Sequence, residues 1–334
     1  MRIGVTYDLR ADYLALGYGE EETAEFDAEI TIASIFEALA SLGHEPVRIG
    51  HVRALAEKLA AGERWDAVFN ICEGLKGVAR EAQVPALLEA YDIPYLFSDP
   101  LTLSLSLDKA MAKRVVKSFG VPTADFAVIE RIEDADAVTL PFPLFLKPVA
   151  EGSGKGVGAK SKVVNRAALK RVAGELLAQF RQPVLVETFL SGREFTVGIL
   201  GTGEAAEVLG VSEIVPKAAY VGAGYGYENK ETGWEDKVDI RPAPPAEAAA
   251  AGEVALAAWR ALRCRDGGRV DVRCDGAGKP HFIEVNPLAG MRPGYSDLCF
   301  IAERAGLSYR ALIGRFLESF LARHPELKAQ REAA

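Results

Sequence analysis

The stretch from residue 268 to residue 287 decides the fold, and it has three parts. It reads Gly268-Arg269-Val270-Asp271-Val272-Arg273-Cys274, then Asp275-Gly276-Ala277-Gly278-Lys279-Pro280, then His281-Phe282-Ile283-Glu284-Val285-Asn286-Pro287. The middle six residues are turn formers, whereas the flanks alternate in polarity and are rich in β-branched side chains. This pattern predicts two antiparallel strands joined by a short loop.

A symmetric loop places four polar side chains on one face of this hairpin. Arg269 then faces Asn286 and Asp271 faces Glu284, and residues two apart on a strand share a face. The residues expected on the opposite face, toward a core, are Val270, Val272, Ile283 and Val285. The register is an inference, because a slip of one residue would divide the polar side chains between both faces.

The facing carboxylates of the hairpin indicate a metal site. Two carboxylates directly opposite each other lie roughly 5 Å apart and repel, which a divalent cation between them would relieve. Asp271, Glu284 and Asn286 offer only oxygen ligands, a set that suits Mg²⁺ together with nucleotide phosphates. An exposed hairpin with a solvated charged face explains the same residues, so the hairpin alone leaves both interpretations open.

Length and composition are those of a soluble globular protein. The chain has 334 residues, of which 49% are hydrophobic and 26% charged, and this suits two or three domains. Its net charge of −8 argues against nucleic acid as a main partner. No apolar run approaches the ~20 residues of a membrane span, and Met1–Tyr7 predicts a strand rather than a signal peptide. Four cysteines without metal spacing suggest reduced thiols, so we expect a cytoplasmic protein without a membrane partner.

Periodicity divides the chain into three parts. Residues 1–104 alternate strand and helix, which predicts a parallel sheet with helices on its faces, and residues 105–190 and 191–330 mix strands and helices. The expected helices are 29–42, 52–61, 81–91, 108–119, 166–180, 246–262 and 309–322. The expected strands are 3–7, 46–49, 65–71, 93–96, 126–129, 144–148, 184–187, 195–200 and 206–211. Residues 8–27 and 213–239 read as long loops.

A glycine-rich run, residues 151–158, follows the expected strand that ends near Lys147. Glycines let backbone N–H groups curl around phosphate oxygens, so we interpret the run as a phosphate-covering flap, with a flexible hairpin tip as the alternative. Lys147 leaves a buried strand beside it. Lys109 opens a helix, where a cation is not favoured by the helix dipole, and this placement suggests a task, with an ordinary surface lysine as the alternative.

Residues 184–194 form a strand that runs into a connector. Backbone groups there could read an adenine edge, with Phe189 against the ring and a carboxylate on the ribose hydroxyls. A crossover between domains explains the stretch equally well.

Together these motifs resemble the ATP-grasp superfamily and, within it, the D-alanine–D-alanine ligase family, over nearly the whole chain. The similar stretches are G-R-x-D at Gly268, E-x-N at Glu284, Lys147-Pro148 with Glu151-Gly152-Ser153, and residues 187–197. Leu107-Asp108-Lys109 is similar to the family's lysine-bearing helix start. The resemblance implies an α/β fold, with an N-terminal parallel-sheet domain (1–104) followed by a two-part α+β ATP-grasp fold (105–190 and 191–330).

The resemblance also implies how ATP and metal are bound. Asp271, Glu284 and Asn286 would hold two Mg²⁺ ions, with Mn²⁺ as a substitute. The phosphates would contact Lys109, Lys147 and Lys230. Adenine would be bound by Glu187 and Leu190, and ribose by Glu194.

The implied reaction has two steps. ATP phosphorylates the carboxylate of one amino acid, and the amine of a second attacks the acyl phosphate. By the resemblance, Arg269 and the Gly290 N–H stabilise the tetrahedral intermediate, Ser153 lies where the flap closes, and Glu29 holds the first substrate's amino group. It also suggests a homodimer. The small-molecule partners would be amino acids.

The chain departs from the family pattern around the second substrate. Glu231 stands where the family has a tyrosine, Arg292 is a new cation, and Ser296 matches the family's serine only with an insertion. The substrate pocket therefore looks rebuilt, and a ligase of specialised metabolism that joins a different amino acid or amine is the alternative to D-alanine ligation. A carboxylase-type ATP-grasp enzyme and a nucleotide-binding module without catalysis are the other hypotheses.

Overall fold

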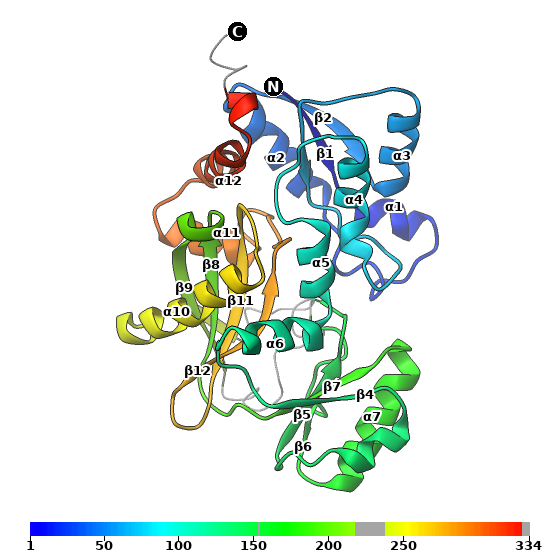
Figure 1. Ribbon diagram of the computed structural model, residues 1–334, viewed down its shortest axis with the longest axis vertical. Coiled ribbons are helices and arrows are strands. Elements are labelled where there is room, and N and C mark those ends of the chain that lie inside the picture. The colour runs from blue at the N-terminus through cyan, green and yellow to red at the C-terminus, as the bar shows by residue number, and fades with distance from the viewer. Residues whose placement is uncertain (153, 218–237, 329–334) are drawn as a thin grey trace.

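The computed structural model describes residues 1–152, 154–217 and 238–328. The N-terminal part of the chain forms a parallel sheet of order β2-β1-β3 (Figure 1). Its strands are β1 (Arg2–Thr6), β2 (Glu45–Gly50) and β3 (Ala67–Asn70). Helix α2 (Glu29–Ser41) packs on one face, and α3 (Val52–Ala60) and α4 (Gln83–Ala90) pack on the other, because each helix carries an apolar stripe. The predicted parallel sheet is thus confirmed. The expected strand 93–96 is wrong, since only a bridge between Val68 and Tyr95 forms there.

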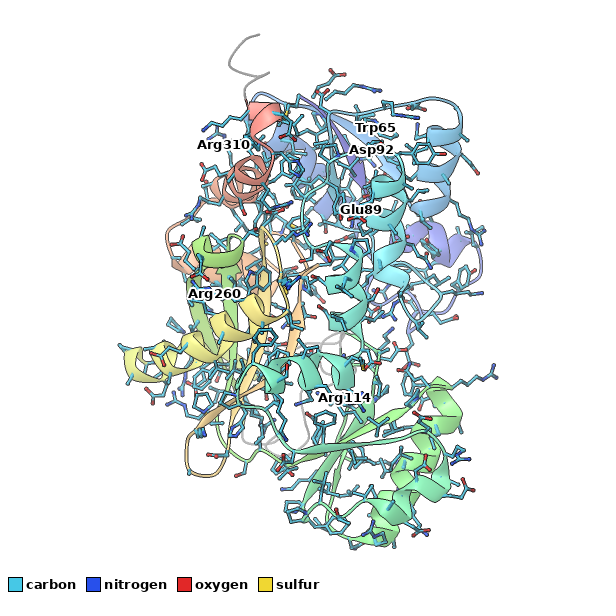
Figure 2. All side chains as sticks on the ribbon, in the orientation of Figure 1. Trp65, Glu89, Asp92, Arg114, Arg260 and Arg310 are labelled. Atoms are coloured by element: carbon cyan, nitrogen blue, oxygen red, sulfur yellow. The ribbon has the colours of Figure 1, made fainter. Side chains whose placement is uncertain are left out.

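The last helix of the chain returns to this first layer. Helix α12 (Tyr309–Arg323) packs beside α2, and its Phe316 and Phe320 share a core with Ile3 (Figure 1). Arg310, labelled in Figure 2, donates hydrogen bonds of 3.1 and 3.2 Å to the Ser41 hydroxyl and carbonyl. The two ends of the chain therefore share one core.

A five-stranded antiparallel sheet of order β10-β9-β8-β11-β12 forms the middle of the molecule. Its strands are β8 (Glu194–Leu200), β9 (Glu207–Pro216), β10 (Val238–Pro242), β11 (Gly267–Cys274) and β12 (Pro280–Asn286). One face packs against α6 (Lys109–Ser118) and α10 (Pro245–Ala261). The other face meets α11 (Asp297–Arg304), so closely that a Cβ at Gly210 would lie 2.9 Å from Ile301.

The third sheet has the order β4-β7-β5-β6 and is covered by α7 (Arg166–Phe180). Its strands are β4 (Phe126–Ile129), β5 (Leu144–Pro148), β6 (Lys162–Val163) and β7 (Val184–Thr188). Helices α1 (Arg10–Ala15), α5 (Pro100–Leu107) and α11 were not expected, and neither were the short helices η1 (Arg80–Ala82), η2 (Ile132–Ala137) and η3 (Gly203–Ala205). Within the described parts of the chain, no helix is long and apolar enough to cross a membrane.

The hairpin of β11 and β12 has the predicted register at its open end. Arg269 pairs with Asn286 and Asp271 with Glu284. A bulge after Asp271 then shifts the pairing, so that Val272 faces Phe282. Phe282 enters the core, and Ile283, which was expected there, lines a cavity instead.

Candidate active site

A cavity of about 120 Å³ lies between the second and third sheets. Strands β5 and β7 supply its lining on one side, and β8, β11 and β12 supply it on the other. Of the residues predicted for the site, those that line it are Lys109, Lys147, Glu187, Leu190, Glu194, Arg269, Asp271 and Glu284. The two sheets therefore bring together residues that are far apart in the sequence.

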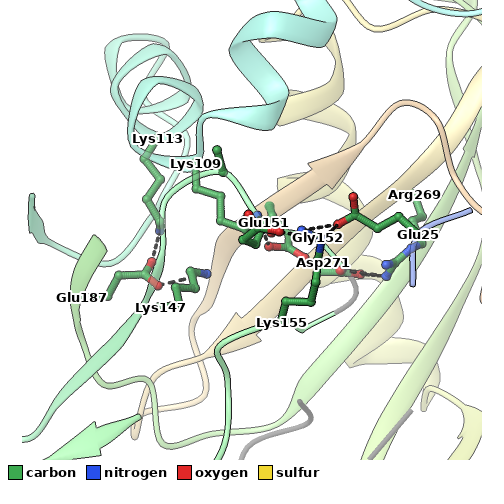
Figure 3. Close-up of polar contacts among 12 residues, drawn as sticks. Glu25, Lys109, Lys113, Lys147, Glu151, Gly152, Lys155, Glu187, Arg269 and Asp271 are labelled. Carbon is green, nitrogen blue, oxygen red and sulfur yellow. Dashed lines mark hydrogen bonds and ion pairs between the residues drawn. The ribbon is translucent and has the colours of Figure 1, made fainter. Parts of the chain in front are cut away.

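Glu187 sits between two lysines on the inner wall of this cavity (Figure 3). Its carboxylate lies 2.6 Å from Lys113 Nζ and 3.1 Å from Lys147 Nζ. The three side chains are almost completely buried. Burial alone would raise the pKa of Glu187, but the two lysines together outweigh it and lower that pKa.

The sequence reasoning missed Lys113, which has no exposed surface at all. It lies on α6 one turn after Lys109, and residues four apart share a helix face, so Lys109 itself was the signal that could have found it. Burial is the largest effect and lowers the pKa of Lys113, although Glu187 opposes it. A cation at this position balances Glu187 and leaves Lys147 at the cavity wall.

Aromatic and charged groups shape the outer end of the same cavity. Phe145 and Phe189 stack with their ring centroids 6.3 Å apart, and Lys162 Nζ lies 4.2 Å from the centre of the Phe189 ring. The carboxylate of Glu194 accepts a hydrogen bond of 2.9 Å from Arg273. An apolar slot with a carboxylate at its rim suits a flat ring attached to a polyhydroxylated group.

Lys109 joins the glycine-rich run to the hairpin. Asp108 caps α6 by accepting a hydrogen bond of 2.9 Å from the Met111 N–H, which fixes the first turn. Lys109 Nζ then donates to the carbonyl of Glu151 and lies 3.4 Å from Glu284. A cation is not favoured at the start of a helix. The contacts of Lys109 with two separate segments therefore explain why a lysine stands there.

The polar face of the hairpin carries the predicted quartet. Arg269 donates to both carboxylate oxygens of Asp271 at 2.8 Å, and the Thr196 hydroxyl donates to Asp271 at 2.9 Å. Burial alone would lower the pKa of Arg269, but the negative charges around it, Asp271 first, raise it. Arg269 is therefore a fixed cation.

The hairpin also provides a donor set for a divalent cation. Asp271 and Glu284 face each other across the strands, and Asn286 follows Glu284 on the same face. The side-chain nitrogen of Asn286 is buried without a hydrogen-bond partner among the described residues, so this amide is not held by the protein alone. Two carboxylates and an amide oxygen suit a hard cation such as Mg²⁺.

A second cavity, of about 130 Å³, adjoins the first. The residues that line both are Lys109, Glu151, Arg269 and Glu284. Asn286 and Gly290 line the second cavity and not the first, together with apolar residues of 287–289 and carboxylates from the N-terminal part of the chain. The oxygen donors that suit a metal ion, those of Asp271, Glu284 and Asn286, therefore lie where the two cavities meet.

The structure places Glu25, and not the predicted Glu29, at this junction (Figure 3). The Glu25 carboxylate lies 2.9 Å from Arg80, accepts a 2.6 Å hydrogen bond from the Gly152 N–H, and lies 3.4 Å from Lys155. Glu29 lines none of these cavities. Its side chain is 55% exposed and pairs with Arg48 of β2. Glu25 gave no sequence signal, since it lies in an aperiodic acidic stretch.

The remaining predicted residues lie at the rim or outside the described residues. Ser296 accepts a 3.0 Å hydrogen bond from the Arg292 N–H and stands next to Gly290, while the Arg292 side chain is exposed over the Tyr295 ring. Neither Arg292 nor Ser296 lines the two cavities. Ser153, Lys230 and Glu231 lie outside the described residues.

Comparison with known proteins identifies D-alanine–D-alanine ligases among the relatives of this chain. Residues 115–318 match the family model described as the D-ala D-ala ligase C-terminus. The chain is 38% identical over 268 residues to a D-alanine–D-alanine ligase of Bordetella petrii, covering 78% of this chain and 77% of the relative. It is 33% identical over 296 residues to D-alanine–D-alanine ligase B of Xanthomonas campestris pv. campestris, covering 86% and 88%.

Solved structures share the fold of this chain. The crystal structure of a D-alanine–D-alanine ligase from Bacillus anthracis complexed with ATP superposes with a TM-score of 0.71 at 23% identity, covering 98% of this chain and 99% of that one. VanG D-Ala:D-Ser ligase from Enterococcus faecalis gives a TM-score of 0.73 at 20% identity, covering 96% and 99%.

Proposed function

The chain belongs to the D-alanine–D-alanine ligase family, and from that membership we propose which of its residues carry out the ATP-dependent joining of a carboxylate to an amine. The protein is an ADP-forming ligase of this type and acts through an acyl phosphate. It uses ATP and a divalent metal ion. The assignments below concern its own side chains.

ATP occupies the first cavity. Its adenine lies in the slot beside Phe189 and Leu190, Glu187 is the carboxylate nearest the ring, and Glu194 accepts from the ribose hydroxyls. The triphosphate runs toward the junction of the two cavities, where Lys109 and Lys147 face it. This placement is supported by the lining of the cavity, which has the aromatic residues Phe145 and Phe189 at its outer end and includes the cations Lys109 and Lys147. Lys230 is proposed as a further phosphate ligand.

Two Mg²⁺ ions would be held by Asp271, Glu284 and Asn286. When bound, such ions neutralise the charge that develops on a transferring phosphoryl group. This assignment is supported by the all-oxygen donor set that the pairing of β11 with β12 brings together. Arg269 orients Asp271 by donating to both of its carboxylate oxygens.

The reaction takes place at the junction. A carboxylate oxygen of the first amino acid attacks the γ-phosphorus, ADP leaves, and the acyl phosphate remains beside Lys109. The amine of the second amino acid then attacks the carbonyl carbon, loses a proton, and expels phosphate. Arg269 and the Gly290 N–H stabilise the oxyanion in this second step. Glu25 holds the glycine-rich run over the junction through the Gly152 N–H, so that water is excluded.

We also propose the organisation around this site. Residues 1–104, 105–190 and 191–330 form three domains, with the site between them. The protein is cytoplasmic and forms a homodimer. Arg292 and Ser296 select the second substrate from the rim of the second cavity, and Glu231 is proposed as a further residue that selects it.

The observation that carries the proposal is the pairing of Asp271 with Glu284 where the two cavities meet. The test is a pairwise screen of D- and L-amino acids, D-alanine included, with ADP release and mass detection of the product. We expect ADP release that requires both Mg²⁺ and an amino acid. The proposal is refuted if no pair of amino acids stimulates ADP release.

A further inference from the structure

Three cavities form a row that leads from the nucleotide site toward the N-terminal sheet. The second and third share Glu25, Glu73 and residues 288–290. The third cavity measures about 20 Å³, which is room for one water-sized group, and it ends at Asp27, Ile71 and Met291. A ligand that starts at the phosphate junction can therefore extend inward past the second cavity.

Three carboxylates along this inner path form no ion pair within contact distance among the described residues. Glu81 lines the second cavity, Asp27 lines the third, and Glu73 lines both. None of them forms an ion pair with a described residue, and Glu81, only 9% exposed, makes no hydrogen bond with one either. A carboxylate that is nine-tenths buried thus borders the cavity without a partner, which is costly for the folded protein.

Two other acidic side chains in the same region do form ion pairs. Glu25 is paired with Arg80 and Lys155, and Glu151 lies 2.6 Å from Lys155. The acids that hold the glycine-rich run therefore form direct ion pairs, whereas Glu81 and Glu73 have only the longer-range influence of cations such as Arg80. Burial is the main cause that raises the pKa of Asp27 and of Glu81 to about 7, and it raises the pKa of Glu73 well above its ordinary range.

The three carboxylates are spread along the path rather than gathered around one point. Among residues 1–152, 154–217 and 238–328, no three His, Cys, Asp or Glu side chains are placed to share a metal ion. Leu288 and Ala289 line both inner cavities and give the path an apolar wall beside these carboxylates. Separate charges beside an apolar wall suit a flexible organic cation better than a compact ion.

We propose that the inner cavities bind a basic amino acid, one with a second amine at the end of an aliphatic side chain, as the substrate whose carboxylate is activated. This inference rests on the proposed ligase function and specifies its substrate class. The α-ammonium group requires one carboxylate, and Glu81 lines the second cavity together with the junction residue Lys109. The aliphatic stem lies on Leu288 and Ala289, and the terminal ammonium group enters the third cavity between Asp27 and Glu73.

The test measures binding separately from turnover. The full-length protein is loaded with Mg²⁺ and a non-hydrolysable ATP analogue and titrated calorimetrically with lysine and ornithine, as both enantiomers, and with norleucine, which has a similar stem without the second amine. We expect one basic amino acid to bind at least tenfold more tightly than norleucine. The inference is overturned if norleucine binds as tightly as every basic amino acid tested.

Matched variants test whether the inner cavities cause the preference for a basic amino acid over norleucine. Glu81→Gln and Asp27→Asn keep the side-chain shape and remove the charge, so each should reduce the preference for the basic amino acid at least tenfold. Glu57→Gln removes the same charge from an exposed position on α3 and should leave the preference unchanged. Preference that survives in both cavity variants overturns the inference.

Turnover of the same ligands separates the two proposals. Selective binding of a basic amino acid without ADP release from any amino acid would refute the proposed function and leave this inference standing. ADP release with alanine and norleucine, without any preference for basic amino acids in binding, would refute this inference and leave the ligase function standing.

Discussion

The backbone N–H of Gly152 donates a 2.6 Å hydrogen bond to the carboxylate of Glu25, so that the segment before α2 holds the glycine-rich run that follows β5 (Figure 3). The same carboxylate pairs with Arg80, and both side chains are 9% exposed. Burial alone would raise the pKa of Glu25, but Arg80 and Lys155 together lower it, so the ionised form is the one that is bound. One residue thus couples the N-terminal part of the chain to the proposed nucleotide site.

Replacing Glu25 should therefore affect both stability and turnover. Glu25→Gln leaves Arg80 buried without its counter-charge, which should cost about 3 kcal/mol in the free energy of unfolding. It also loosens the run over the junction, and a small misplacement there should lower ADP release by roughly a hundredfold. Urea denaturation and a coupled ADP assay measure the two effects.

The matched control is Glu29→Gln, which removes the same charge from the partly exposed pair with Arg48. A surface pair of this kind contributes less than about 1 kcal/mol, and Glu29 lines none of the cavities described, so both measurements should change little. Equal losses in Glu25→Gln and Glu29→Gln would contradict the assignment of Glu25.

Asp271→Asn tests the hairpin as a metal site. The substitution keeps the shape but removes one of two charged ligands, so it should raise the Mg²⁺ concentration needed for half-maximal activity. It should also reduce kcat/KM by roughly a hundredfold or more. Asp275→Asn, in the turn of the same hairpin, is the control, because its carboxylate only accepts hydrogen bonds from the N–H groups of Ala277 and Lys279. An unchanged Mg²⁺ requirement in Asp271→Asn would remove the metal assignment.

The hairpin also shows what a sequence can predict. Alternating polarity and a turn of defined length fix the pairing of Asp271 with Glu284, because only one register keeps the valines inside. The bulge that follows could not be predicted. Phe282 and Ile283 are both apolar, so either one could enter the core, and the choice depends on packing against other helices.

Side-chain partners between distant segments escaped prediction for a different reason. Lys113 lies on an amphipathic helix, where a lysine is usually exposed, and its burial depends on Glu187, 74 residues later in the chain. Glu25 lies in a stretch without periodicity, so nothing local distinguishes it from its acidic neighbours. A family motif led to Glu29 instead, and the structure places that residue at the surface.

Glu187→Gln should destabilise the protein strongly. The change leaves Lys113 and Lys147 buried and facing each other without a counter-charge, which should cost about 3 to 5 kcal/mol at pH 7. The pKa of Glu187 is lowered in the folded protein, so its contribution is present above the ordinary pKa of about 4.3 and is lost as the pH falls through the folded value. The difference from wild type should therefore narrow below pH 4.

A second variant separates charge from packing at this position. Adding Lys113→Met to Glu187→Gln removes the unpaired cation and should recover part of the lost stability, as measured by urea denaturation. If the double variant is as unstable as the single one, charge balance is not what holds Glu187 in place.

Glu81→Gln should stabilise the unliganded protein in a pH-dependent way. Burial is the main cause that raises the pKa of Glu81 to about 7, with Arg80 and Lys109 opposing it and Glu25 adding to it. An acid whose folded pKa is raised destabilises the folded state above that pKa, and the penalty disappears as the pH falls to the unfolded value of about 4.3. The variant should thus gain about 3 kcal/mol at pH 8 and almost nothing at pH 4.5. Urea denaturation at the two pH values, with Glu57→Gln as the exposed control, measures this difference, and a variant no more stable than wild type at pH 8 would show that Glu81 already has a counter-charge.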